Sequence, residues 1–160
     1  MQMPALRIRH LLCAMAALGG AGALAQPLEP TPRWWINAGF YTHHFDANAG
    51  LQNENPGLGL EWSRDDSYAL TGGVFTNSDR QTSHYLGLYV TPVHWAQGHW
   101  GVVAGAFDGY PHAFGGSWFP AVLPIVKWEG AAWGLHVAYI PTLPDRLYGG
   151  LAFQLKFAIR

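Results

Sequence analysis

Alternation between apolar and polar residues is the dominant pattern of this 160-residue chain. Near its end, every second residue is large and apolar: Leu151, Phe153, Leu155, Phe157 and Ile159. The residues between them are small or polar: Ala152, Gln154, Lys156 and Ala158. A period of two residues predicts a β-strand with one apolar face. No segment after residue 34 keeps the helical period of 3.6 residues, so the chain is predicted to be all-β.

Turn residues divide this pattern into eight expected strands. They cover residues 34–43, 57–64, 68–76, 82–91, 99–107, 117–128, 132–140 and 148–159. An even number of strands, each of about 9 to 11 residues, is typical of a barrel that crosses an outer membrane. A spanning sheet must close, because unpaired edges are costly in hydrocarbon. The predicted fold is an eight-stranded antiparallel up-and-down transmembrane β-barrel.

The alternative is a soluble sandwich or lipocalin-like barrel, whose apolar side chains would point inward. Two features favour the membrane barrel. One face of the strands is rich in Gly and Ala, and tryptophans lie near the strand ends, as in the aromatic belts of membrane proteins. These tryptophans are Trp34, Trp62, Trp100, Trp128 and Trp133.

The first residues have the features of an export signal. Arg7 and Arg9 precede an apolar run at 11–24, which is too short and too glycine-rich for a transmembrane helix, and small residues follow it. We therefore expect a cleaved signal peptide at 1–25, a short proline-rich periplasmic lead at 26–33 and the barrel at 34–160. The expected location is the outer membrane of the cell.

Charge and cysteine content exclude several classes of function. Nine Lys and Arg residues against ten Asp and Glu residues leave no basic surface for nucleic acid. The single cysteine, Cys13, lies in the signal segment, so no disulfide is expected in the mature chain. The histidines outside the first loop show no metal-ligand spacing. We expect a monomer without metal or cofactor.

The candidate chemistry lies in the connections that would face outward, at 44–56, 77–81, 108–116 and 141–147. His43 and His44 end the first strand, and a Ser follows Asn77 at the tip of the third and fourth strands. Separately, these are common surface and turn residues, and 53–56 also reads as an ordinary turn. In a small barrel, however, the tops of strands one and three are near each other, so a His and a Ser could pair.

The segment from Phe119-Pro120 through Pro124 to Tyr139-Ile140-Pro141 resembles strands six and seven of the PagP family of lipid A palmitoyltransferases. The resemblance extends over most of the mature chain and aligns Phe75-Thr76-Asn77-Ser78 with the family's Phe-x-Asp-Ser catalytic loop. It implies that Ser78 is the reactive hydroxyl and His44 its base, with His43 as a near-equal alternative. Asn77 replaces the family's Asp, and Asp79 or Asp46 would have to supply its charge. Pro120, Pro124 and Pro141 would weaken a seam that admits lipid laterally.

The resemblance implies an outer-membrane acyltransferase that moves an acyl chain from a phospholipid to lipid A or a related glycerolipid. Tyr89 aligns with a small residue at the floor of the family's hydrocarbon pocket, so we expect a chain shorter than palmitoyl. The alternative is a non-catalytic small barrel with a structural, lipid-binding or solute-passage role. Asn77 and Tyr89 favour that alternative.

Overall fold

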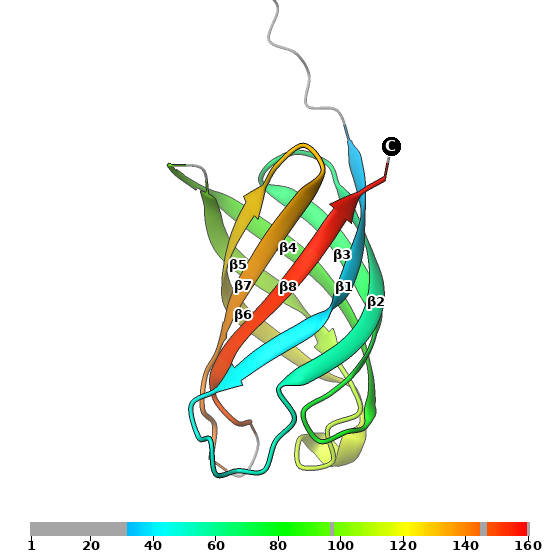
Figure 1. Cartoon of the computed structure of the whole chain (residues 1–160), viewed down its shortest axis with the longest axis vertical. Coiled ribbons are helices and arrows are strands. Elements are labelled where there is room, and N and C mark those ends of the chain that lie inside the picture. Colours follow the sequence, from blue (N-terminus) through cyan, green and yellow to red (C-terminus); the bar gives the residue numbers. More distant parts are fainter. Residues whose placement is uncertain (1–31, 97, 145–146, 160) are drawn as a thin grey trace, which may run out of the picture.

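The chain folds into a closed barrel of eight antiparallel strands (Figure 1). The computed structural model describes residues 32–96, 98–144 and 147–159, so the expected signal peptide at 1–25 and most of the lead at 26–33 lie outside the described residues. The strands are β1 (Arg33–His44), β2 (Glu54–Ser63), β3 (Tyr68–Thr76), β4 (Thr82–Trp95), β5 (Gly98–Phe107), β6 (Phe119–Glu129), β7 (Trp133–Ile140) and β8 (Gly150–Ala158).

Each strand pairs with the next in sequence, and β8 pairs with β1 from Trp35↔Ala158 to His44↔Gly150, which closes the sheet. The prediction of an eight-stranded antiparallel up-and-down barrel is confirmed. The one helical segment in the described residues is a 3₁₀ turn at Phe114–Gly116. No helix in that part of the chain is long and apolar enough to cross a membrane.

β2 and β4 extend past the expected strand ends because each passes a proline at a β-bulge. β2 begins at Glu54, and its residues Pro56 and Gly57 together oppose the single residue Gly39 of β1. β4 continues to Trp95, and its residues 91–92, which include a proline, oppose Gly101 of β5. A bulge tolerates the missing donor of a proline. The prediction of a turn at 53–56 was wrong for this reason.

Glycine is required opposite both bulges, because the extra residue brings backbone close to the partner strand. A Cβ atom on Gly39 would collide with the carbonyl oxygen of Asn55, and one on Gly101 with the carbonyl oxygen of Val90. Single-sequence patterns do not show which glycine faces which proline, so the bulges could not be predicted.

The apolar side chains of the alternating pattern point outward. On β8, Leu155 and Phe157 are exposed, whereas Gln154 and Lys156 are buried in the barrel interior. Leu58 on β2, Leu86 on β4 and Val122 on β6 are each more than 60% exposed, at 63%, 64% and 64%. The exterior is therefore apolar, and buried polar groups lie inside.

The two ends of the barrel differ (Figure 1). At one end, where β1 begins and β8 ends, short turns join β2–β3, β4–β5 and β6–β7; we call this the terminal end. At the other, the loop end, the connections are 45–53, 77–81, 108–118 and 141–149. These four connections bring the candidate chemistry of the sequence to one rim.

Candidate active site

A cavity of about 90 Å³ opens at the loop end, and both His44 and Ser78 line it. A second cavity of about 80 Å³ continues from it into the barrel interior. The two share the residues Thr42, Phe107, Tyr110, Leu123 and Ile140. We call the combined space the lumen pocket. The His and the Ser that the sequence placed in different parts of the chain thus line one cavity.

His44 is the last residue of β1, and its side chain is turned inward and only 7% exposed. Its Nδ1 lies 2.7 Å from the side-chain oxygen of Asn53. His43 is exposed, because neighbouring residues of a strand face opposite sides of the sheet. Of the two histidines that the sequence left open, His44 is the one that lines the lumen pocket.

Ser78 lies in the connection between β3 and β4, and hydrogen bonds join this connection to the β1–β2 loop. The backbone N–H of Gln52 donates to the carbonyl oxygen of Ser78 at 3.0 Å. The guanidinium of Arg80 donates to the carbonyl oxygen of Gly50 at 3.3 Å. The loop that follows His44 and the loop that carries Ser78 therefore form one connected structure.

Asn77 is fully buried, and its side-chain amide makes four hydrogen bonds. Its Nδ2 donates to Ser83 Oγ at 2.8 Å and to the carbonyl oxygen of Gly109 at 2.7 Å. Its Oδ1 accepts from the backbone N–H groups of Asp79 and Gln81 at 2.9 and 3.0 Å. Asn77 does not line the lumen pocket. It holds the Ser78 loop in position.

Of the two carboxylates that the sequence offered in place of the family's Asp, only Asp79 lines the cavity beside Ser78. Asp46 is exposed and accepts from the backbone N–H of Asn48 at 2.9 Å, as in an ordinary turn.

The phenol of Tyr110 lines the same cavity as Asp79. Burial raises the pKa of Tyr110, and the Asp79 charge raises it further. Tyr110 therefore keeps its proton and can donate a hydrogen bond into the pocket.

Aromatic and aliphatic side chains form the wall of the lumen pocket below this rim. Phe40, Phe75 and Tyr85 pack edge to face, with ring centroids between 4.9 and 6.0 Å apart. Tyr89, predicted as the pocket floor, is 4% exposed and lines the deeper cavity. Its ring packs edge-on against His136 at 4.7 Å. The wall suits a hydrocarbon chain rather than a charged solute.

The ladder between β6 and β7 is short and lies only towards the terminal end. It runs from Ile125↔Ala138 to Glu129↔Gly134, whereas β5 pairs with β6 up to Phe107↔Phe119. Pro120 and Pro124 lie where β6 has no partner on the β7 side. Being four residues apart, they would direct their missing N–H groups to the same neighbour.

This unpaired stretch separates the lumen pocket from an outer groove. Pro120 and Pro141 line the groove, and Phe119, Ala121, Leu123 and Leu147 line both the groove and the pocket. Side chains at the gap thus face both spaces. The prolines that the resemblance associated with lateral access do border an interrupted ladder.

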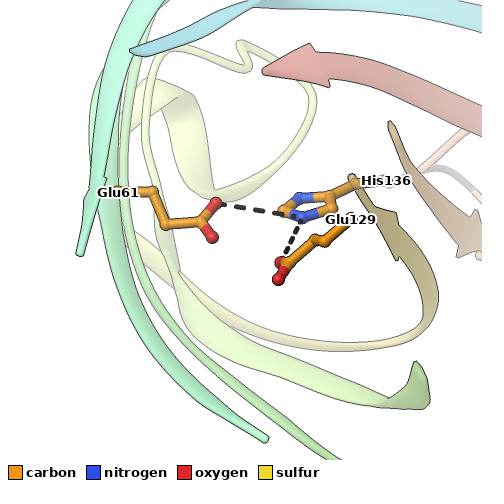
Figure 2. A group of neighbouring side chains, drawn as sticks. All are labelled: Glu61, Glu129 and His136. Atoms are coloured by element: carbon orange, nitrogen blue, oxygen red, sulfur yellow. Dashed lines mark ion pairs between the residues drawn. The ribbon is translucent and has the colours of Figure 1, made fainter. Parts of the chain in front are cut away.

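Below the pocket floor, charged side chains fill the interior towards the terminal end. Lys156 donates to the carboxylates of both Glu61 and Glu129, the latter at 2.6 Å, and Lys127 lies 3.3 Å from Glu129. His136 Nε2 lies 3.9 Å from Glu61 and 4.0 Å from Glu129 (Figure 2). We call these five residues the lumen charge cluster. The cluster occupies the interior next to the deeper cavity, which His136 also lines.

The sequence did not predict this cluster, although the inward positions of Glu61, Lys156 and His136 followed from the alternation. Glu61, Glu129 and His136 place ligating atoms within 4.8 Å of one another, close enough to hold a metal ion. The ammonium of Lys156 already binds both carboxylates, however, and Lys127 adds a second positive charge. A divalent cation would have to displace or repel these charges, so the donor set fits a salt-bridge network better than a metal.

The sequence also missed Asn53 and Tyr110 as site residues. Asn53 was read as part of a turn, and Tyr110 lies in a Gly- and Pro-containing loop that gives no signal of its position.

A comparison with protein-family models finds no match to the chain, and neither does a comparison with curated proteins.

Proposed function

We propose that the protein is a PagP-like outer-membrane acyltransferase, which moves an acyl chain from a phospholipid to lipid A or a related glycerolipid. One observation carries the proposal. Ser78 and His44 line the mouth of a pocket whose apolar wall continues into the barrel, beside an interrupted β6–β7 ladder. A nucleophile, a base and a hydrocarbon site are the parts that acyl transfer from a lipid requires.

The apolar exterior supports the membrane location. Large exposed apolar side chains occur on every strand, and soluble monomers rarely expose contiguous apolar surface on this scale. At the terminal end the exterior carries exposed Trp34, Trp95, Trp100, Trp128 and Trp133. At the loop end it carries exposed Tyr41, Trp118, Tyr139 and Tyr148. Two aromatic girdles around an apolar band are typical of outer-membrane barrels.

The proposed reaction begins when His44 accepts the proton of Ser78 and the Ser78 oxygen attacks the ester carbonyl carbon of the phospholipid. Tyr110 donates a hydrogen bond to the carbonyl oxygen as it becomes negative. The ester C–O bond breaks, and His44 returns the proton to the departing lysophospholipid alkoxide. A hydroxyl of the acceptor then attacks the acyl-serine ester, His44 takes its proton and gives it to Ser78.

A lipid-binding barrel without catalysis is the second candidate. Asn77 favours it, because its neutral amide is fully engaged in holding the loop and supplies no anion to the site. Solute passage is disfavoured in either case, because the lumen charge cluster fills the interior below the pocket.

Mass spectrometry of lipid A and phospholipids distinguishes these candidates. Cells that express the wild-type chain should contain an additional acylated lipid and the matching lysophospholipid, and cells that express Ser78→Ala should not. Ser67→Ala, at the terminal end of the barrel, is the matched control and should behave as wild type. Identical lipid profiles for wild type and Ser78→Ala under envelope stress would exclude the enzyme.

A further inference from the structure

The imidazole of His44 has a side-chain partner that the sequence did not indicate. Asn53 immediately precedes β2, and its Oδ1 lies 2.7 Å from His44 Nδ1. An amide oxygen can only accept a hydrogen bond, so this contact is a hydrogen bond in the tautomer that carries its proton on Nδ1. Nε2 then carries the lone pair that a general base needs. No hydrogen bond to Nε2 is present among the described residues.

The backbone around Asn53 is held from both sides. Its carbonyl oxygen accepts from the N–H of Thr42 at 2.8 Å, which fixes it beside β1. Asn55, two residues further on, is buried; it donates to the carbonyl oxygen of Thr76 at 3.0 Å and accepts from the Thr42 hydroxyl at 3.0 Å. Gln52, on the other side of Asn53, donates to the Ser78 carbonyl oxygen. The same segment therefore positions the partner of the base and the loop of the nucleophile.

We infer that Asn53 is the positioning residue of His44: its amide oxygen fixes the Nδ1–H tautomer and leaves Nε2 free towards the pocket that Ser78 lines. This inference rests on the proposed acyltransferase function. It gives Asn53 the orienting role that a carboxylate has in a Ser-His-Asp triad, and that an amide has in the Cys-His-Asn arrangement of papain-like proteases. Asn77, by contrast, only holds the loop.

The tautomer can be measured without any activity. Long-range ¹H–¹⁵N spectra of the purified, ¹⁵N-histidine-labelled protein in detergent micelles report which ring nitrogen carries the proton, and loss of a signal in His44→Gln assigns it. Wild type and Asn53→Asp should show the Nδ1–H form. Asn53→Leu should shift to the Nε2–H form or to a mixture. Asn48→Leu, an exposed asparagine of the same loop, should match wild type.

Acyl transfer provides the second readout. In Asn53→Leu, kcat should fall about 10²-fold or more while KM stays within about threefold, because the tautomer and orientation of the base His44 are lost and the lipid site is not. Asn53→Asp should restore kcat, and the acid limb of its pH–rate profile should move to higher pH, because a carboxylate favours the imidazolium. The other titratable groups that line the cavity with His44 are Asp79, Tyr110, His112 and Tyr148, and they are unchanged in all variants.

The two readouts separate the inference from the proposed function. An Nε2–H tautomer in wild type or an unchanged tautomer in Asn53→Leu would overturn the positioning role. So would a failure of Asn53→Asp to restore kcat when the wild type is active. The expected tautomers without acyl transfer in any variant would overturn the proposed function and leave the positioning of His44 standing. Heat-modifiable migration of every variant checks that the barrel has folded.

Discussion

Asn77 and Gly109 are joined by a hydrogen bond of 2.7 Å from the side-chain amide of one to the backbone carbonyl of the other. The bond ties the connection that carries Ser78 to the β5–β6 loop that carries Tyr110. It requires a donor, and a carboxylate at position 77 would place an oxygen against the Gly109 carbonyl. The resemblance to the PagP family aligns Asn77 with an aspartate. The hydrogen bond to Gly109, however, requires the donor that an amide has and a carboxylate lacks.

We predict that Asn77→Asp lowers the free energy of unfolding and does not raise acyl transfer. It removes the donor to the Gly109 carbonyl and leaves two buried acceptors facing each other, at a cost of about 1–3 kcal/mol. Urea unfolding in lipid vesicles measures the change. Asn48→Asp, the same substitution at an exposed position, is the control and should leave stability unchanged. A variant that is both more active and equally stable would contradict the prediction.

Much of the fold could be predicted because one physical rule, a period of two residues, acts on every strand. It assigned the inward and outward faces of β2, β7 and β8 correctly, including the burial of Glu61, His136 and Lys156. Strand ends were wrong where proline was read as a terminator. Pro56 and Pro92 both lie at bulges, and a bulge depends on the opposite glycine, which belongs to another strand.

The site was predicted less completely, because it depends on contacts between loops. The order of strands in a barrel was sufficient to place His44 near the Ser78 loop. The partner of His44 was missed, because Asn53 lies in a segment whose composition is that of a turn. The lumen charge cluster was missed because the tilt and stagger of the strands decide which inward residues meet across the interior.

We predict different effects of the two neighbouring histidines. His44→Ala should lower kcat by about 10²–10⁴-fold, the range for loss of a general base, whereas His43→Ala should remain within a few-fold of wild type. The reason is that His44 lines the lumen pocket and His43 faces outward. Initial rates with a fluorescent phospholipid donor in mixed micelles measure the difference. Equal losses in both variants would show that the histidines act through stability alone.

The pocket floor gives a prediction about chain length. Tyr89→Gly removes the ring that ends the pocket against His136, so the acyl chain that is transferred should become longer. The same change should destabilise the barrel by roughly 3–5 kcal/mol, as for other losses of a buried aromatic ring. Mass spectrometry of the product with a mixture of donors reports the length. Tyr68→Gly, an exposed tyrosine, is the control, and an unchanged length in Tyr89→Gly would reject the floor.

The interrupted ladder gives a prediction about lipid entry. In the double variant Pro120→Ala, Pro124→Ala, two N–H donors are restored in the stretch of β6 that has no β7 partner, which should extend the ladder and close the gap. Two added hydrogen bonds of about 1 kcal/mol each would slow lateral entry about tenfold or more in kcat/KM. Pro92→Ala, at the bulge near the terminal end, is the control and should not slow transfer. Unchanged kcat/KM in the double variant would show that lipid enters elsewhere.

The lumen charge cluster should contribute to stability and not to the chemistry at the rim. Lys156 donates to Glu61 and Glu129 together, so Lys156→Met leaves two buried carboxylates with only Lys127 to balance them. Removing one partner of a buried ion pair costs about 3–5 kcal/mol, and urea unfolding should show a loss of that size while acyl-chain selectivity stays the same.

Zn²⁺ should not stabilise the wild type, because the carboxylates already bind lysine. In Lys156→Met, where Glu61 has lost its lysine and Glu129 keeps only Lys127, added Zn²⁺ should recover part of the loss. Stabilisation of the wild type by Zn²⁺ would instead identify Glu61, Glu129 and His136 as metal ligands.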